Sequence, residues 1–181
     1  MGRWFFGVDI RSLGSGNAGG TNTLRTLGWR AALPVMAIDV GKGALAATLP
    51  RLTGTLEPAW LPVACAALAV LGHCYPVFAS FRGGKGVATG GGVMVVISPW
   101  ATLACAAVWG VTVALTRLVS LASILAALAL PLAIWLLPGD QPPGLIPLAL
   151  ALAAFVLWTH RSNISRLRRG EEPQITVGRD S

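Results

Sequence analysis

The segment LASILAALALPLAIWLL, from Leu121 to Leu137, decides the fold because it contains no charged side chain. A helix needs about 20 apolar residues to cross the roughly 30 Å of hydrocarbon in a membrane. Five more apolar runs accompany it, and we expect them to form spans at Ala31–Leu49, Ala59–Ala79, Val87–Ile97, Trp100–Thr116 and Gly144–Trp158. The sequence therefore predicts an all-α, polytopic membrane helix bundle of six transmembrane helices, in a single domain over residues 1–181.

The two middle runs are separated at Ser98-Pro99, because proline lacks a backbone N–H and restricts the residue before it. The first of them, Val87–Ile97, reaches only about 16 Å at the helical rise of 1.5 Å per residue. We therefore expect this helix to lie partly recessed among its neighbours.

The composition also favours a membrane protein. Of the 181 residues, 54% are hydrophobic and 12% are charged, and the mean hydropathy is +0.67. A soluble domain carries about a quarter charged residues, so these values argue against a soluble globular protein and against disorder. The cysteines lack C-x-x-C spacing, and we expect small buried apolar side chains rather than disulfides or metal ligands at Cys65, Cys74 and Cys105.

The placement of the basic residues predicts the orientation in the membrane. With alternating spans, nearly all Lys and Arg fall on one side, while Arg51 falls on the other side and Lys42 lies within a span. Loops rich in Lys and Arg face the cytoplasm, so we expect both ends of the chain and the loops described below to be cytoplasmic. The net charge of +7 is thus partly topological, and we expect no nucleic-acid partner.

The first polar segment is GSGNAGGTNTLR, from Gly14 to Arg25, ahead of the first span. Its glycines spell G-x-G-x-x-G, but a dinucleotide fold also needs a βαβ unit and an acidic residue about 20 positions later. The next acid, Asp39, lies inside a span, so that interpretation fails. Glycine-rich loops also turn backbone N–H groups toward anions, and Arg25 adds a positive charge. An anion site and a flexible loop between helices both fit this pattern.

The second polar segment is GHCYPVFASFRGGKG, from Gly72 to Gly86. It is not a nucleotide-binding P-loop, because Lys85 is followed by glycine instead of the Ser or Thr that binds Mg²⁺. Arg82 and Lys85 nevertheless lie on a glycine-rich turn that leads into a helix, and a helix N-terminus attracts anions. An ordinary basic cytoplasmic loop explains the two charges but not the glycines around Lys85.

Further polar residues follow or interrupt the spans. The segment HRSNISRLRRGEE, His160–Glu172, comes after the last span, and its charge alone favours a basic tail that faces lipid. Asp39 and Lys42 lie one helical turn apart within a span, where ionisable groups are costly, and we expect a structural ion pair. Ser120 and Ser123 lie near a helix start, as caps or as ligands.

Some catalytic patterns do not occur in the sequence. Neither His73 nor His160 begins an H-x4-D motif, there is no G-x-S-x-G motif, and no set of His, Cys and acidic residues has metal-ligand spacing. A Ser–His–Asp hydrolase and a zinc enzyme therefore have no support in the sequence.

Together, these segments resemble the bacterial acyl-phosphate:glycerol-3-phosphate acyltransferases, which are integral membrane enzymes that begin phospholipid synthesis. The resemblance runs from Gly7 to Glu172, and it includes the short motifs Asp9-Ile10-Arg11, Lys42-Gly43 and Ser120-Leu121-Ala122-Ser123. The family has seven helices, the first of them ahead of the first glycine-rich loop, whereas only six residues precede Gly7 here. Two expectations stay open: the start codon lies farther upstream, or this member lacks the first helix.

The resemblance implies transfer of a fatty acyl group from acyl phosphate to the sn-1 hydroxyl of glycerol 3-phosphate, giving lysophosphatidic acid and phosphate. It implies no cofactor and no metal, the two substrates and membrane lipid as partners, and a place in the bacterial inner (plasma) membrane. The catalytic residues that it implies are Lys85, Ser15, His160 and Asn163. The residues that it implies for binding substrate phosphate are Gly16, Asn17, Thr21, Asn22, Arg25, His73, Arg82, Gly83, Gly84, Gly86, Ser120 and Ser123.

Several interpretations stay open at this point. The general base is either His160 or a phosphate oxygen of the substrate. A small membrane transporter or channel for an anion is the main alternative function, because charges inside a span and the broken stretch Val87–Thr116 suit an ion pathway. A structural subunit that docks a partner is another alternative, and it leaves the glycine-rich loops unexplained.

Overall fold

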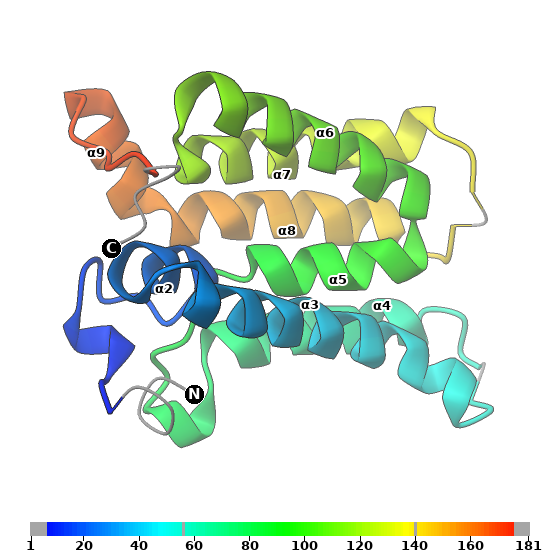
Figure 1. The fold of residues 1–181 in the computed structure, drawn as a ribbon. Coiled ribbons are helices and arrows are strands. Elements are labelled where there is room, and N and C mark those ends of the chain that lie inside the picture. The colour runs from blue at the N-terminus through cyan, green and yellow to red at the C-terminus, as the bar shows by residue number, and fades with distance from the viewer. Residues whose placement is uncertain (1–6, 56, 140, 176–181) are drawn as a thin grey trace. The chain divides into compact units, whose positions relative to one another are not determined.

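The computed structural model describes residues 7–55, 57–139 and 141–175, and all regular elements in this part of the chain are helices (Figure 1). The chain divides into two compact units, unit 1 up to Ile97 and unit 2 from Ser98. The elements of unit 1 are η1 (Ile10–Ser12), α2 (Gly20–Leu27), α3 (Trp29–Leu52), α4 (Leu61–Cys74), η2 (Val77–Ala79) and α5 (Val87–Ile97). The elements of unit 2 are α6 (Pro99–Thr116), α7 (Val119–Leu136), α8 (Leu145–Thr159) and α9 (Arg161–Arg169).

Unit 1 is organised around α3, which packs against α2, α4 and α5 (Figure 1). Glycines let α3 and α5 approach closely: a Cβ atom at Gly43 would overlap the carbonyl oxygen of Thr89, and one at Gly92 would overlap that of Val40. Small residues allow such backbone contact between membrane helices, whose association depends on van der Waals packing. This contact fixes the start of α5, and the glycine-rich turn before it, relative to α3.

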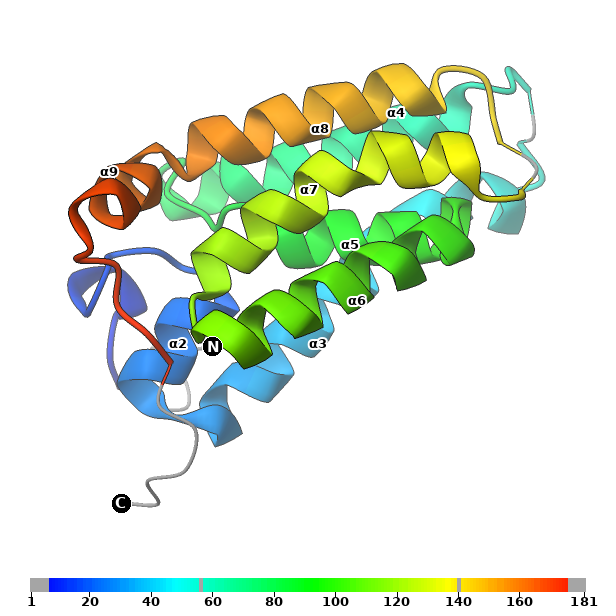
Figure 2. The same cartoon turned by 90° about the horizontal axis from the view of Figure 1, so that it is seen from above.

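Unit 2 is built on α7, which packs against both α6 and α8 (Figure 2). At His160 the chain bends by 60° from α8 into α9. Helix α9 ends at Arg169 and is capped by Gly170, whose φ of 70° is a left-handed value that glycine adopts readily. The following segment turns back, and the N–H of Ile175 donates to the carbonyl oxygen of Arg117 at 2.9 Å, between α6 and α7.

Each of the six predicted apolar spans coincides with a helix over most of its length, and the predicted break at Ser98-Pro99 separates α5 from α6. Helix α5 is short, with 11 residues, and α8 with α9 could form a further span only as a bent pair. Large apolar side chains such as Leu68, Leu115 and Trp135 are exposed, as expected for surfaces that face lipid. Four helical segments are long and apolar enough to cross a membrane, namely Trp29–Leu52, Leu61–Ala79, Pro99–Thr116 and Val119–Leu136.

The C-terminal end of α4 departs from the predicted span Ala59–Ala79. The regular helix ends at Cys74, and the 3-10 turn η2 follows Pro76, which cannot donate a backbone hydrogen bond. The chain therefore leaves the helix just after His73 and folds back toward it. All cysteines are free, as predicted, with Cys74 buried and with Cys65 and Cys105 half-buried.

Candidate active site

The first glycine-rich loop is held together by Asn22, which is buried in the first turn of α2. Its Nδ2 lies 3.0–3.1 Å from three carbonyl oxygens, those of Ile10, Leu13 and Asn17. Its Oδ1 accepts the backbone N–H of Ser15 at 2.9 Å. The two N–H donors of Nδ2 are shared among these three oxygens, so one side chain contacts four backbone groups of a loop that has no regular hydrogen-bond ladder. The amide of Asn22 is therefore committed to the framework of the loop.

The other predicted residues of this loop surround that framework. The Oδ1 atom of Asn17 accepts the N–H of Gly19 at 2.9 Å, just ahead of α2. This contact shapes the loop at the N-terminus of the helix, where backbone N–H groups have no partner within the helix. Ser15 and Gly16 are exposed, and Thr21 and Arg25 are half-buried on α2.

The second glycine-rich turn packs on the C-terminal end of α4. The N–H of Gly84 donates to the carbonyl oxygen of His73 at 3.3 Å. A Cβ atom at Gly83 would overlap that same oxygen, and a Cβ atom at Gly84 would overlap the His73 ring. Gly86 has a φ of 83°, which is a left-handed value. Glycine is required here by close packing and by backbone conformation, and Lys85 is carried on this turn directly before α5.

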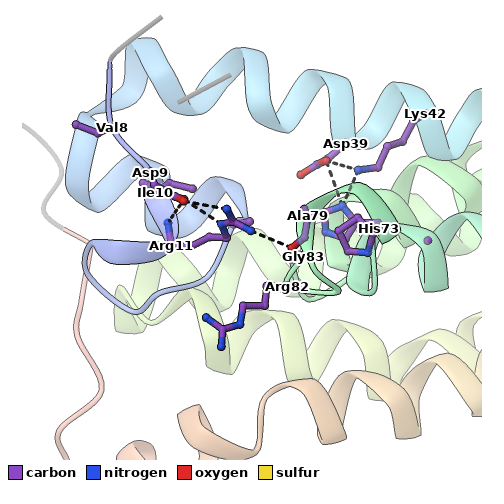
Figure 3. A pocket seen from close by; sticks show the side chains of 14 residues that line it. Val8, Asp9, Ile10, Arg11, Asp39, Lys42, His73, Ala79, Arg82 and Gly83 are labelled. Atoms are coloured by element: carbon purple, nitrogen blue, oxygen red, sulfur yellow. Dashed lines mark hydrogen bonds and ion pairs between the residues drawn. The ribbon is translucent and has the colours of Figure 1, made fainter. Parts of the chain in front are cut away.

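The two glycine-rich segments meet at Gly19 and Gly84. A Cβ atom at Gly19 would lie 4.0 Å from the Cα of Gly84. A cavity of about 430 Å³ lies beside this contact (Figure 3). Its lining comes from the segment around η1, the first loop, α3, α4, the η2 segment and the second turn. It consists of Val8, Asp9, Ile10, Arg11, Ala18, Asp39, Lys42, Gly72, His73, Pro76, Ala79, Arg82, Gly83 and Gly84.

Three cationic side chains line the cavity, and two of them are paired with acids (Figure 3). Arg11 donates to Asp9 from Nε at 3.0 Å and from Nη2 at 2.8 Å, and its Nη1 donates to a carbonyl oxygen of η2 at 2.9 Å. Lys42 pairs with Asp39. Within the residues that the structure describes, the guanidinium of Arg82 makes neither an ion pair nor a hydrogen bond. Arg82 is therefore available to an anion in the cavity.

The predicted ion pair of Asp39 and Lys42 is confirmed, and His73 joins it. The Nζ atom of Lys42 lies 2.6 Å from Oδ1 of Asp39 and 2.6 Å from Nδ1 of His73, while Nδ1 of His73 lies 3.3 Å from the same Oδ1. The sequence predicts only a phosphate-binding role for His73. The structure adds a contact with charged groups of α3 that the sequence did not indicate.

Unit 2 holds the remaining predicted site residues, among them His160 and Ser123. Nδ1 of His160 lies 2.9 Å from the carbonyl oxygen of Val156. Because a carbonyl oxygen only accepts, Nδ1 carries a proton, and Nε2 is the nitrogen that would serve a general base. The hydroxyl of Ser123 donates to the carbonyl oxygen of Val119 at 2.8 Å and accepts from Nε1 of Trp109 at 3.3 Å, so it joins α7 to α6.

A second polar cluster of unit 2 is centred on the buried carboxylate of Glu172. Asn163, also buried, donates to Oε1 at 2.7 Å, and Nε of Arg166 donates to Oε2 at 2.8 Å. Burial alone would raise the pKa of Glu172, but interactions with Asn163, Ser120 and Arg166 outweigh it and lower that pKa below its ordinary value of 4.5. The segment after α9 is therefore anchored by an ionised carboxylate.

A family model described as "Glycerol-3-phosphate acyltransferase" matches residues 1–170. The chain belongs to the glycerol-3-phosphate acyltransferase family. The acyltransferase of Geobacillus kaustophilus is 46% identical over 175 residues, which cover 97% of this chain and 86% of that relative. The acyltransferase of Synechococcus elongatus is 45% identical over 180 residues, which cover 96% of this chain and 85% of that relative.

Solved structures agree with this membership in the glycerol-3-phosphate acyltransferase family. The chain is similar to PlsY, an integral membrane glycerol 3-phosphate acyltransferase, in its glycerol 3-phosphate form, with a TM-score of 0.86 and 37% identity over 94% of this chain and 84% of that chain. The lysophosphatidic acid form of PlsY gives a TM-score of 0.81 and 36% identity over 90% of this chain and 81% of that chain. The predicted fold class and the predicted family are thus confirmed, and the chain is an integral membrane acyltransferase.

Sequence reasoning missed some residues that shape this acyltransferase. Arg11 and Asp9 line the cavity; they belong to a short motif of the resemblance but were not among the predicted site residues, and their signal was the close spacing of an acid and a base next to the first glycine-rich loop. Glu172 lies in a predicted segment but was not among the predicted site residues, although a buried acid after a run of arginines invites a pairing. Among the described residues, no group of three or more His, Cys, Asp or Glu side chains could hold a metal ion.

Proposed function

We propose that the enzyme takes its acyl group from acyl phosphate and transfers it to the sn-1 hydroxyl of glycerol 3-phosphate. The observation that carries this proposal is the meeting of two glycine-rich segments beside a cavity whose lining includes Arg82, a guanidinium without a partner among the described residues. Both substrates carry phosphate, so a site for the reaction needs cations and exposed backbone N–H groups. The similarity to the glycerol 3-phosphate and lysophosphatidic acid forms of PlsY supports the acceptor and the product.

The proposed acyl transfer needs neither a cofactor nor a metal. The sn-1 hydroxyl oxygen attacks the carbonyl carbon, an ester bond forms, and the bond from that carbon to the phosphate oxygen breaks. Phosphate leaves with the bonding electrons, and the hydroxyl proton passes to a base, either His160 or a phosphate oxygen of the substrate. Acyl phosphate is a mixed anhydride with a good leaving group, so positioning and stabilisation of the oxyanion should supply most of the rate enhancement.

The roles that we propose follow from where each group lies. Lys85, carried on the glycine-rich turn, holds the transferring acyl phosphate and the oxyanion. Arg25 and the exposed Ser15, together with Asn17, hold glycerol 3-phosphate. The acyl chain lies between helices and enters sideways from the bilayer, which suits the large exposed apolar side chains of the helices.

The family match over residues 1–170 supports a single acyltransferase domain over residues 1–181. We further propose that the enzyme lies in the bacterial inner (plasma) membrane with its glycine-rich loops in the cytoplasm. The concentration of Lys and Arg on one side of the spans supports this orientation. Acyl phosphate and glycerol 3-phosphate are its partners, along with membrane lipid.

Purified protein in detergent, given acyl phosphate and glycerol 3-phosphate, tests the proposal. We expect release of inorganic phosphate and formation of lysophosphatidic acid that depend on both substrates, and activity that persists in EDTA. Acyl-CoA should not replace acyl phosphate, because the sequence holds no H-x4-D motif. Comparable turnover with acyl-CoA would overturn the donor. Movement of an anion across vesicles without product formation would instead favour a transporter.

A further inference from the structure

We infer that Asp39, Lys42 and His73 form a positioning triad that sets the glycine-rich turn, and with it Lys85, in the place that acyl transfer requires. The triad lies within α3 and α4, and its three side chains meet at one edge of the cavity (Figure 3). These residues act through the turn and not by contact with the reacting atoms, so the inference assigns them a supporting role in the reaction.

The first step is the orientation of the His73 ring. An ammonium group only donates, so Lys42, at 2.6 Å, donates to Nδ1 of His73 and the ring proton lies on Nε2. Asp39 accepts from the same ammonium at 2.6 Å. The side chains of Asp39 and His73 are 9% and 8% exposed, so these contacts lie in a region of low dielectric where an unpaired charge would be costly. The ring is therefore fixed on one edge by an ion pair.

The second step is the contact of the opposite edge with the turn. The three atoms nearest to a Cβ placed at Gly84 are Nε2, Cε1 and Cδ2 of the His73 ring. The N–H of Gly84 also donates to the carbonyl oxygen of His73. The turn therefore lies directly on the ring, and Lys85 is the next residue along the chain.

The third step concerns what fixes the turn on its other side. Helix α5 starts at Val87, and α3 and α5 are in backbone contact at Gly43 and Gly92. Helix α3 thus determines the position of the turn twice, through the His73 ring before Lys85 and through α5 after it. Because its backbone is held on both sides, Lys85 loses less conformational freedom when it binds a transition state. A small displacement of Lys85 should therefore lower the rate of transfer.

The competing explanation is that Asp39 and Lys42 only neutralise each other's charge within the membrane. A double variant distinguishes this explanation from the positioning triad. Lys42→Met alone leaves the buried carboxylate of Asp39 without its cation, and Asp39→Asn alone leaves the ammonium of Lys42, whose side chain is 39% exposed, without its acid. Both should lower the thermal midpoint in detergent, Lys42→Met more so. The double variant removes both charges and should recover that midpoint. It also removes the donor to Nδ1 of His73, so we expect kcat to stay about 10- to 100-fold low, with KM for glycerol 3-phosphate little changed. Recovery of both the midpoint and kcat would overturn the positioning triad.

A second test uses the contact between the ring and the turn, and it does not depend on charge. Gly84→Ala should lower kcat, because its Cβ displaces the ring or the turn. His73→Asn keeps an acceptor for Lys42 but removes the ring atoms that the Cβ would meet, so adding Gly84→Ala to it should change kcat by no more than about twofold. If the double variant instead loses kcat by the product of the two single-variant factors, the ring and the turn act independently. Gly41→Ala on α3 is the matched control, because a Cβ there meets nothing within 4 Å.

The role of Lys85 in this inference rests on the proposed function, and the wild-type assay separates the two. If wild-type protein turns over with a different acyl donor, the donor proposal fails, and the triad is tested with that donor on the same variants. If wild-type protein uses acyl phosphate and the double variant regains full kcat, the triad alone fails.

Discussion

The side-chain amide of Asn163 donates to Oε1 of Glu172 at 2.7 Å, and this contact binds the segment after α9 to the helix itself. Glu172 also accepts from Nε of Arg166 at 2.8 Å, and its side chain is 1% exposed. A buried carboxylate with charged and neutral donors stabilises a fold only while it is ionised. The segment is therefore a place where protonation should loosen the structure.

Glu172→Gln should lower the free energy of unfolding by about 1–3 kcal/mol, because hydrogen bonds to a charged group are replaced by weaker neutral ones. The pKa of Glu172 is below 4.5 in the folded state, so its stabilisation is complete above about pH 4.5 and is lost as the pH falls through the lower folded-state value. The thermal midpoint of wild-type protein in detergent, measured between pH 3 and 7, should fall on acidification. The midpoint of Glu172→Gln should fall less. The neighbouring Glu171→Gln is the control, since its ion pair with Arg169 is exposed and should contribute less than about 1 kcal/mol. Equal effects of the two changes would contradict the assignment.

Asn22→Ala should destabilise the first loop more than it weakens any direct substrate contact. Its amide contacts four backbone groups, with the two protons of Nδ2 shared among three carbonyl oxygens, and a buried polar group left without a partner costs about 1–3 kcal/mol. We expect a clearly lowered thermal midpoint together with lower activity, and a smaller change for Asn17→Ala, whose side chain holds the N–H of Gly19. An unchanged thermal midpoint with a raised KM for glycerol 3-phosphate would show that Asn22 contacts the substrate directly.

The spans were predictable because membrane helices must be apolar over most of their length, as Leu121–Leu137 shows. The spacing of Asp39 and Lys42 likewise predicted their ion pair, since residues three apart share a helix face. The contact of His73 with Lys42, 31 residues away in the sequence, depends on how α4 packs on α3, and no local sequence pattern encodes it. The same holds for Asn22, because amides that bind ligands and amides that brace loops look alike in a sequence.

Arg25→Ala should mainly raise KM for glycerol 3-phosphate, by about 10- to 100-fold, because one charge-assisted hydrogen bond to phosphate is lost. The residue lies half-buried in the last turn of α2, so some loss of stability is expected as well and is followed by the thermal midpoint. Arg30→Ala is the matched control, since this exposed arginine stacks on Trp29 outside the cavity. A large fall in kcat at unchanged KM would place Arg25 on the transferring group instead.

Lys85→Met should lower kcat and kcat/KM together, because the contact that it removes is made in the transition state. One well-aimed donor to a developing oxyanion contributes about 3 kcal/mol, which corresponds to a rate loss of about 100-fold. Steady-state kinetics with both substrates varied will show whether KM stays near its wild-type value. Full kcat in Lys85→Met would show that the charge is not needed for the transfer.

His160 is one of the two candidates for the general base, and a phosphate oxygen of the substrate is the other. Its Nδ1–H donates to the carbonyl oxygen of Val156 at 2.9 Å, so Nε2 is the ring nitrogen that would take a proton. His160→Ala should then lower kcat by about 10²–10⁴-fold, the usual contribution of a general base. His160→Asn tests the same point more sharply, because an amide can keep the contact with Val156 while lacking the basic nitrogen. If both variants lose less than about tenfold, a phosphate oxygen of the substrate takes the proton, and His160 serves to join α8 to α9.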